Sequence, residues 1–152
     1  EKNTGRLLGA QVVGSDGVDK RIDVFATACS AGMTVYDLEN LDLAYTPPFS
    51  SPKDPVNIAS QVASNILRKD VEVMIPYELN EKYQLLDVLK APMFFRDSIS
   101  GAKNIPISKL RDNIGELGNK KIAIYCPVGY TSYLAYRILK QHGFDVKNLS
   151  GG

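Results

Sequence analysis

The spacing of hydrophobic positions changes along the chain at the charged stretch 68–70. Before it, residues 6–14 are rich in apolar side chains and bounded by turn signals, which predicts a strand. Ile22, Phe25 and Cys29 then recur at spacings of three and four, which predicts one face of a helix. After the charged stretch, short apolar runs alternate with amphipathic segments, a pattern typical of an α/β fold.

Two further helices are predicted in the first part of the chain. Thr34 can cap a short helix, because Asp37 follows three residues later in a pattern close to a capping box. Pro55 suits the first turn of a longer helix that begins near Val56. Between them, residues 44–55 contain four prolines, which remove N–H donors and fix φ. We therefore expect a rigid loop there.

The second part of the chain reads as alternating strands and helices. Residues 104–117 predict a strand end, a turn and a helix. Residues 131–143 predict an amphipathic helix, because Leu134 and Ile138 lie four apart, and Gly143 ends it. The run 120–126 is apolar almost throughout, as expected for a parallel strand that is buried on both faces. Further strands are predicted at 71–76, 83–89 and 144–152.

Composition narrows the class of protein. The chain has 152 residues, 44% of them hydrophobic, and a net charge of +1 with acids and bases interspersed, which indicates a globular protein. This balance argues against a nucleic-acid or polybasic membrane partner, and no apolar run reaches the length of a membrane span. Two cysteines far apart fit a reducing cytoplasm better than a disulfide framework. The chain begins without Met and ends on a turn signal, so we expect a piece of a longer protein.

Cys126 is the candidate for chemistry. It lies where the apolar run ends and the amphipathic helix is about to begin. Open α/β sheets place their sites at the carboxyl ends of parallel strands. Backbone N–H groups of a loop wrapped around the sulfur, together with the helix N-terminus, would stabilise a thiolate and lower the thiol pKa. The alternative is a buried core cysteine, since free cysteines are among the most buried residues.

The loop after Cys126 has the composition of an anion cradle. Gly129 tolerates the positive φ that a tight loop needs, and Thr131 and Ser132 offer hydroxyls for capping or anion binding. A phosphatase would need Arg where Ser132 stands, to clamp a phosphate with two hydrogen bonds, so that class is disfavoured. The predicted substrate- or anion-binding loop consists of Pro127, Val128, Gly129, Tyr130, Thr131 and Ser132.

The other reactive side chains favour structural roles. Cys29 lies on the apolar face of its predicted helix, without a charged neighbour or a Gly-rich loop. His142 is the single histidine and lies in the last turn of a helix, where a cation favours the helix dipole. No second ligand of suitable spacing accompanies it, so no metal site is predicted.

Residues 70–152 resemble a single rhodanese (sulfurtransferase) domain. The resemblance lies in "LLDVL", "GAKNIPISKLR" and above all "IAIYCPVGYTSYLAYRILKQHGFDVKNLSGG". It implies that Cys126 takes a sulfane sulfur, forms a persulfide and passes the sulfur to a thiol. Leu89 stands where the family carries Arg after its Asp-Val pair, and Asp97-Ser98-Ile99 replaces the usual Gly-His-Ile. These departures keep open a second hypothesis, a degenerate binding module.

Residues 1–68 resemble the dimerisation domain of the pyridine nucleotide-disulfide oxidoreductases, in the branch of coenzyme A-disulfide reductases, NADH oxidases and persulfide reductases. The resemblance runs through "GAQVVGSDGVDKRIDVFATACSAGMTVYDLENLDLAYTPPFSSPKDPVNIASQVASNIL". It implies a homodimer and a Tyr that reaches the partner's active site, which Tyr45 matches. Its phenol would donate a hydrogen bond or proton to a thiolate or disulfide.

Together the two resemblances predict a fold and a set of partners. The expected fold is an α+β dimerisation domain with an antiparallel sheet and helices (1–68), followed by an α/β rhodanese-like domain with a parallel sheet (69–152). The implied cofactors are FAD and NAD(P)H, with coenzyme A or its persulfide as an implied ligand or sulfur donor. This chain has no G-x-G-x-x-G motif, so we expect the cofactors to be held by upstream domains and not by the fragment alone.

Overall fold

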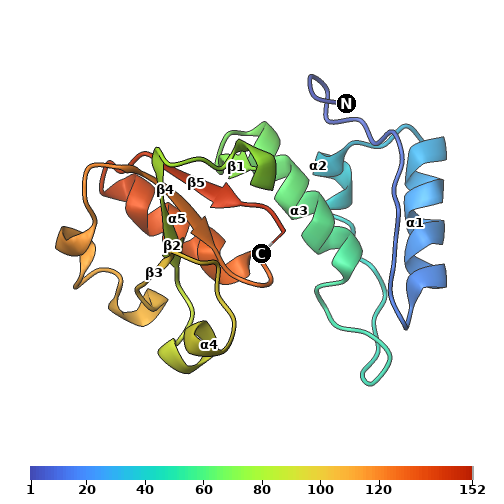
Figure 1. Cartoon of the computed structure of the whole chain (residues 1–152). Helices are drawn as coiled ribbons and strands as arrows, with labels where there is room; N and C mark the ends of the chain where they lie inside the picture. Colours follow the sequence, from blue (N-terminus) through green and yellow to red (C-terminus); the bar gives the residue numbers. More distant parts are fainter. Residues whose placement is uncertain (152) are drawn as a thin grey trace. The chain divides into compact units, whose positions relative to one another are not determined.

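A computed structural model describes residues 1–151 of the chain. Contacts divide the chain into two compact units, Glu1–Asp70 and Val71–Gly152. Figure 1 shows a helical unit at the blue-to-green end of the sequence and a mixed unit at the yellow-to-red end. Each unit has buried apolar residues of its own.

The first unit is built from three helices, α1 (Val18–Ser30), α2 (Val35–Leu38) and α3 (Pro55–Leu67). Two of their starts follow from the sequence. Thr34 and Asp37 form the capping box predicted for α2. The Asp54 carboxylate caps α3 by accepting the N–H of Val56 at 3.0 Å. The core of this unit is centred on Ala28, Leu38 and Val56, which come from the three helices.

The antiparallel sheet predicted for the first domain is wrong. Within residues 1–70 the structure has one isolated antiparallel bridge, between Arg6 and Thr34. Two backbone hydrogen bonds, of 2.8 and 2.9 Å, flank it. The apolar residues of 8–14 do produce an extended segment, but a strand also needs a neighbour that takes up its N–H and C=O groups. The described sheet lies wholly in the second unit.

The second unit contains a five-stranded sheet with every neighbouring pair parallel. The strand order is β1-β5-β4-β2-β3, so β4 lies at the centre. The strands are β1 (Val73–Met74), β2 (Tyr83–Asp87), β3 (Lys103–Asn104), β4 (Lys121–Tyr125) and β5 (Val146–Leu149). This is the parallel α/β arrangement that the alternation of apolar runs and amphipathic segments indicated.

Side chains of β4 alternate between two apolar layers. Ile122 and Ile124 belong to the cluster that includes residues of α5 (Tyr130–Gln141). Ala123 and Tyr125 belong to a second cluster. Because successive side chains of a strand point to opposite faces, this alternation explains why the strand is apolar almost throughout.

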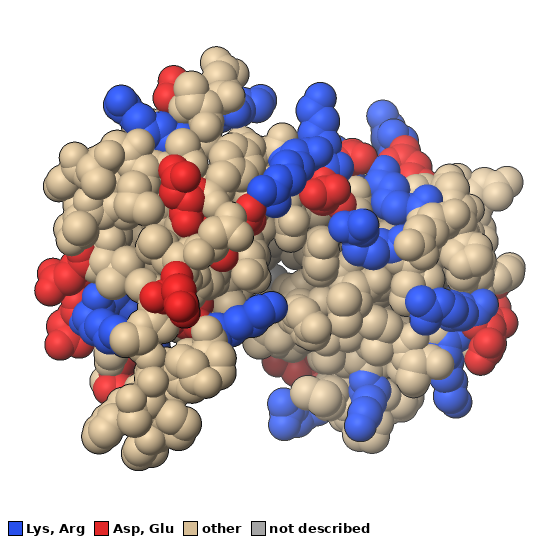
Figure 2. Space-filling view, turned by 180° about the vertical axis from the view of Figure 1, so that it is seen from behind, with Lys and Arg blue, Asp and Glu red and all other residues tan. Residues whose placement is uncertain are grey.

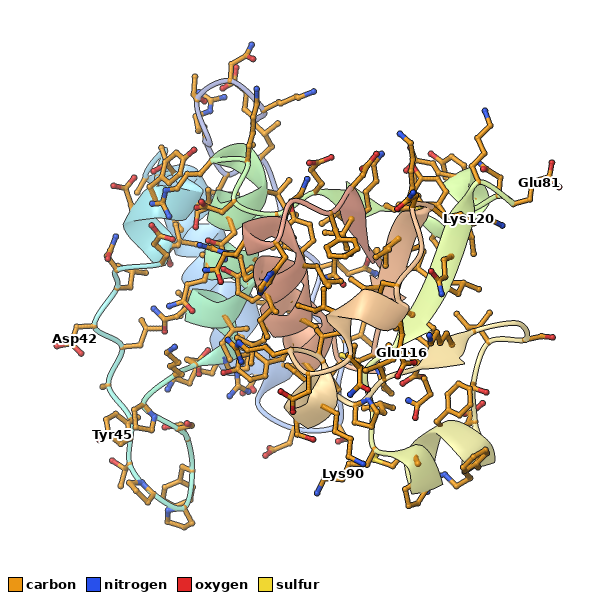
Figure 3. The ribbon with its side chains drawn as sticks, turned by 90° about the vertical axis from the view of Figure 1, so that its left-hand side faces the viewer. Asp42, Tyr45, Glu81, Lys90, Glu116 and Lys120 are labelled. Carbon is orange, nitrogen blue, oxygen red and sulfur yellow. The ribbon has the colours of Figure 1, made fainter. Side chains whose placement is uncertain are left out.

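The parallel strands bring their carboxyl ends to one edge of the sheet. Glu81 and Lys120, which precede β2 and β4, lie together at one end in Figure 3, and Lys90, which follows β2, lies at the other. The register pairs Asp87 of β2 with Tyr125 of β4. The residue after Tyr125, which is Cys126, is therefore at the edge where α/β sheets place their sites.

One expectation for the second unit was wrong, and one of its helices was not predicted. The helix predicted within 104–117 is replaced by two 3₁₀ turns, Ile107–Lys109 and Ile114–Glu116. Gly115 helps explain this, because glycine lowers helix propensity. A short helix not predicted from the sequence, α4 (Ala91–Arg96), follows β2 with Pro92 in its first turn. Among residues 1–151, no helix combines the length and the apolar character needed to cross a membrane.

Candidate active site

Cys126 lies directly after the last residue of β4 and is 1% exposed. The strand continues its alternation at this position, so the side chain joins Ile122 and Ile124 in the layer that faces α5. The polypeptide then turns through three residues and enters α5 at Tyr130. The sulfur is thereby held under the N-terminus of a twelve-residue helix.

Ser132 makes two contacts with the sulfur. Its backbone N–H donates to Cys126 Sγ at 3.3 Å, and its Oγ lies 3.4 Å from the same atom. The Ser132 hydroxyl also lies 3.0 Å from the carbonyl oxygen of Gly129, to which it donates. A neutral thiol can thus donate to Ser132 Oγ, whereas a thiolate would attract the hydroxyl proton away from Gly129.

Gly129 allows the helix to begin where it does. It has φ 75 and ψ −20, a left-handed conformation that disfavours residues with a side chain. A Cβ built there would meet nothing within 4 Å, so backbone conformation and not space selects glycine. Since Gly129 has no side chain to cap the helix, the sulfur accepts the free N–H of Ser132 in place of a capping oxygen.

The surroundings of Cys126 favour its thiolate. Burial raises the pKa of Cys126, but hydrogen bonding from the Ser132 hydroxyl and from the backbone amides of Ser132, Val128 and Gly129 outweighs it, so the pKa is lowered. The partial positive charge at the start of α5 acts in the same direction. A thiolate is the nucleophilic form of cysteine, so the site can carry out thiol chemistry.

The loop that covers the sulfur is exposed. Pro127, Val128 and Tyr130 face solvent, with Val128 83% and Tyr130 68% exposed. Thr131 is partly buried, and Ser132 is fully buried beside the sulfur. None of the seven loop residues from Cys126 to Ser132 carries a positive charge, so amides and hydroxyls provide the stabilisation of an anion here.

The buried Asp87 and the partly buried Asn104 form a hydrogen-bonded pair that supports the neighbouring turn. Asp87 is 0% exposed, and its Oδ1 accepts the N–H of Leu89 at 2.7 Å and the Nδ2 of Asn104 at 3.4 Å. Asn104 Nδ2 also donates to the carbonyl oxygen of Leu89 at 2.9 Å. This pair was not among the residues predicted from the sequence. Asp87 lies within the strand predicted at 83–89, and only the structure shows that β2 ends at Asp87 beside the end of β3 at Asn104.

Tyr45 lies in the first unit and is not part of the Cys126 loop. It is 49% exposed, on the arm of the proline-containing loop, as Figure 3 shows. Figure 2 shows the tip of this loop as a projection of uncharged residues at the lower left. Phe49, 82% exposed, lies in the same loop. The exposure leaves the Tyr45 side chain accessible to another molecule.

A groove of about 390 Å³ lies in the first unit and not at Cys126. The extended segment 9–13 and residues of α1 and α3 line it, among them Phe25 and Ala59. Arg21 borders it and pairs with the buried Asp54 at 3.3 Å. Among residues 1–151, no group of three or more His, Cys, Asp or Glu side chains is placed to hold a metal ion.

The parallel sheet and the strand-to-helix cysteine define an α/β domain with a thiol site. The family model described as rhodanese-like domain matches residues 77–152. A rhodanese-related protein of Thermoplasma volcanium is 33% identical, with a TM-score of 0.50, over 53% of this chain and 85% of that protein. The chain belongs to the rhodanese-like domain family. The family model of the pyridine nucleotide-disulphide oxidoreductase dimerisation domain matches residues 1–55.

Longer relatives match both parts of the chain. The reduced CoADR-RHD of Bacillus anthracis is 43% identical, with a TM-score of 0.85, over 90% of this chain and 26% of that one. A NAD-dependent persulfide reductase from A. fulgidus is 42% identical, with a TM-score of 0.81, over 91% of this chain and 26% of that one.

The curated relatives match a smaller part of the chain. The coenzyme A disulfide reductase of Staphylococcus epidermidis is 47% identical over 58 residues, which are 38% of this chain and 13% of that protein. The chain therefore spans only a small part of the longer relatives. The resemblance to the C-terminal region of coenzyme A-disulfide and persulfide reductases is confirmed.

Proposed function

We propose that this chain is the C-terminal part of a flavoprotein disulfide or persulfide reductase, in which Cys126 relays sulfane sulfur as a persulfide. The observation that carries the proposal is the contact between Cys126 Sγ and Ser132 at the start of α5, with the N–H at 3.3 Å. It gives the thiol the environment of a nucleophile. The family matches and the names of the longer relatives support the same chemistry.

The sulfur relay consists of two exchanges at sulfur. The Cys126 thiolate attacks the outer sulfur of a donor R–S–SH, such as coenzyme A persulfide. A new S–S bond forms to Cys126, the donor's S–S bond breaks, and the donor leaves as a thiol that takes the proton. An acceptor thiolate then attacks the outer sulfur of the Cys126 persulfide and restores the Cys126 thiolate. The two steps balance without an external oxidant or reductant.

The remaining parts of the reaction belong to the proposed whole protein. Release of sulfide from an acceptor persulfide takes two electrons, which NAD(P)H would supply through FAD. The residues of this chain do not fit either cofactor, because the 152 residues contain no G-x-G-x-x-G motif and no described Gly-rich phosphate loop follows a strand of the sheet. The upstream domains of the same chain are the proposed holders of both cofactors.

The first unit has two proposed roles in that protein, dimerisation and the contribution of Tyr45. The match of residues 1–55 to a dimerisation domain supports a homodimer. The exposed Tyr45 phenol would then donate a hydrogen bond or proton to a thiolate or disulfide in the partner's active site. Tyr45→Phe should slow disulfide reduction in the full-length enzyme at unchanged dimer affinity. Equal rates would refute this role.

The relay is tested by intact mass spectrometry. The chain carrying Cys29→Ser is incubated with coenzyme A persulfide, and separately with thiosulfate. Its intact mass is then measured. One added sulfur atom is expected, and none after the further change Cys126→Ser. The Cys29→Ser background removes the other thiol, which is partly buried.

The competing function is a binding module without sulfur transfer. The 1% exposure of Cys126 favours it, because a fully buried sulfur must become accessible before a donor can reach it. A folded sample that gains no sulfur from either donor would establish this alternative over the relay.

A further inference from the structure

Residues 89–99, here termed the α4 segment, leave the sheet after β2 and carry helix α4. Side chains at the ends of two strands hold both ends of the α4 segment. At its start, Asp87 Oδ1 accepts the N–H of Leu89 at 2.7 Å. At its end, the hydroxyl oxygen of Tyr125 accepts the N–H of Ile99 at 3.0 Å. The position of the α4 segment therefore depends on Asp87 and Tyr125.

Asp87 and Tyr125 lie side by side, because the parallel register pairs them at the ends of β2 and β4. The two residues are 0% and 4% exposed. Asp87 Oδ2 is buried and has no hydrogen-bond partner within residues 1–151. Because a buried phenol needs an acceptor for its proton, the two groups complement each other. Burial raises the pKa of Tyr125, and the charge of Asp87 acts in the same direction, so the phenol keeps that proton.

The α4 segment and the loop of Cys126 start from neighbouring strands at the same edge of the sheet. β2 and β4 are adjacent in the strand order, and Tyr125 directly precedes Cys126. Leu89, the first residue of the α4 segment, packs against the buried cluster that contains Cys126. A sulfur donor that approaches Cys126 from this edge therefore meets the α4 segment beside the loop.

The surface of the α4 segment combines apolar and positively charged side chains. Met93 and Phe95 are 43% and 82% exposed. Lys90 and Arg96 are exposed before and after them, and Asp97 is the single acid of the segment. In Figure 3, Lys90 lies at the edge of the sheet where α4 begins. The α4 segment thus offers an apolar centre between two cations.

We propose that the α4 segment is the surface on which coenzyme A persulfide docks to reach Cys126, and that Asp87 and Tyr125 position this surface, with the Tyr125 hydroxyl donating to Asp87 Oδ2. The inference deepens the sulfur relay under Proposed function and rests on it. Coenzyme A persulfide fits the surface because a long uncharged arm joins its sulfur to anionic phosphates. The arm lies against Phe95, and the phosphates face the cations. Thiosulfate has the negative charge but not the arm.

The test measures sulfur loading of Cys126 by intact mass against the concentration of coenzyme A persulfide, in the Cys29→Ser background. Tyr125→Phe keeps the buried ring but loses the hydroxyl that holds Ile99. The concentration for half-maximal loading should rise by roughly threefold to tenfold, because one hydrogen bond is lost. The maximal rate should stay near the original, because the thiol is unchanged. Tyr83→Phe is the matched control, since it removes a hydroxyl from the same apolar layer at the opposite end of β2.

Exposed residues test the docking surface without a change to the core. Phe95→Ser should raise the half-maximal concentration of coenzyme A persulfide severalfold and change loading from thiosulfate less. Tyr77→Ser is the matched control, because Tyr77 is 84% exposed but follows β1, which lies two strands from β4. It should leave loading near the original. Iodoacetamide has neither the arm nor the phosphates, so it should alkylate Cys126 at the original rate in every variant.

A double-mutant cycle tests the hydrogen bond between the two positioning residues. Asp87→Asn keeps an oxygen for the N–H of Leu89 but replaces the acceptor of the Tyr125 proton by an amide. If the phenol donates to the carboxylate, Asp87→Asn with Tyr125→Phe should cost less than the sum of the two single losses in loading. Additive losses would overturn this hydrogen bond. Circular dichroism confirms that each variant is folded.

The outcomes separate the docking surface from the relay on which it rests. An original chain that takes up no sulfur would overturn the relay and the docking surface together. Loading that is unchanged by both Tyr125→Phe and Phe95→Ser would overturn the docking surface and leave the relay intact. Equal slowing of loading and of iodoacetamide alkylation by Tyr125→Phe would overturn the positioning role, because the variant would then act on the thiol itself.

Discussion

The contact between Ser132 and the sulfur leads to a quantitative prediction for Ser132→Ala. The variant keeps the backbone N–H at 3.3 Å but loses the hydroxyl at 3.4 Å. A hydrogen bond to a charged group contributes about 1.5–3 kcal/mol. To donate to the thiolate, the hydroxyl must leave the carbonyl oxygen of Gly129, which costs about 1 kcal/mol. The net stabilisation of the thiolate is therefore about 0.5–2 kcal/mol.

This free energy translates into reactivity. Hydrogen bonds from Ser132 help lower the Cys126 pKa, so Ser132→Ala raises that pKa and reduces the thiolate fraction at a given pH. Below both pKa values, alkylation should slow by roughly 2- to 30-fold, because about 1.4 kcal/mol corresponds to a factor of ten. Above both pKa values the two thiols are fully ionised and the rates should converge. The variant can then be slightly faster, since nucleophilicity rises with pKa.

The assay is the rate of iodoacetamide alkylation at Cys126 against pH, followed by intact mass in the Cys29→Ser background. Thr131→Val is the matched control, because it removes the neighbouring hydroxyl, which makes no hydrogen bond to the sulfur in the described structure. A rate ratio that stays the same at every pH would refute the reasoning. It would show that Ser132 acts through access or folding and not through the thiolate.

Three further predictions concern the scaffold. Leu86→Ala removes a fully buried side chain from the sheet core and should lower the free energy of unfolding by about 2–5 kcal/mol in urea titration. Asp54→Ala removes the cap of α3 and should cost about 1 kcal/mol or more in the same assay, whereas Asp54→Asn should keep most of the capping contribution. Gly129→Ala forces a left-handed conformation on a residue with a side chain, costs about 1–2 kcal/mol, and should also slow the alkylation of Cys126.

Each of these predictions has a result that would contradict it. Urea midpoints unchanged by Leu86→Ala would mean that the core relaxes to fill the space. Equal losses for Asp54→Ala and Asp54→Asn would place the effect in the ion pair with Arg21 and not in the cap. Gly129→Ala with normal stability and normal alkylation would show that the loop does not need its left-handed residue.

The amino-acid sequence determined the local elements and the identity of the candidate nucleophile. The capping box at Thr34, the proline at the start of α3 and the apolar run of β4 are local signals, and the structure has each of them. The run that ends at Cys126 and the glycine that follows it predicted a thiol under a helix N-terminus. Such patterns are readable because they depend on residues close together in the chain.

Tertiary structure decided what depends on distant partners. Residues 6–14 have the composition of a strand, but pairing needs a second strand, and residues 1–70 provide one isolated bridge instead of a sheet. The helix expected within 104–117 gave way to 3₁₀ turns, because local propensity is weak there and packing overrides it. The sequence offered Thr131 and Ser132 equally, as hydroxyls that could cap the helix or bind an anion. Only the folded loop shows that Ser132 contacts the sulfur of Cys126, because the direction in which α5 leaves Gly129 turns that side chain inward.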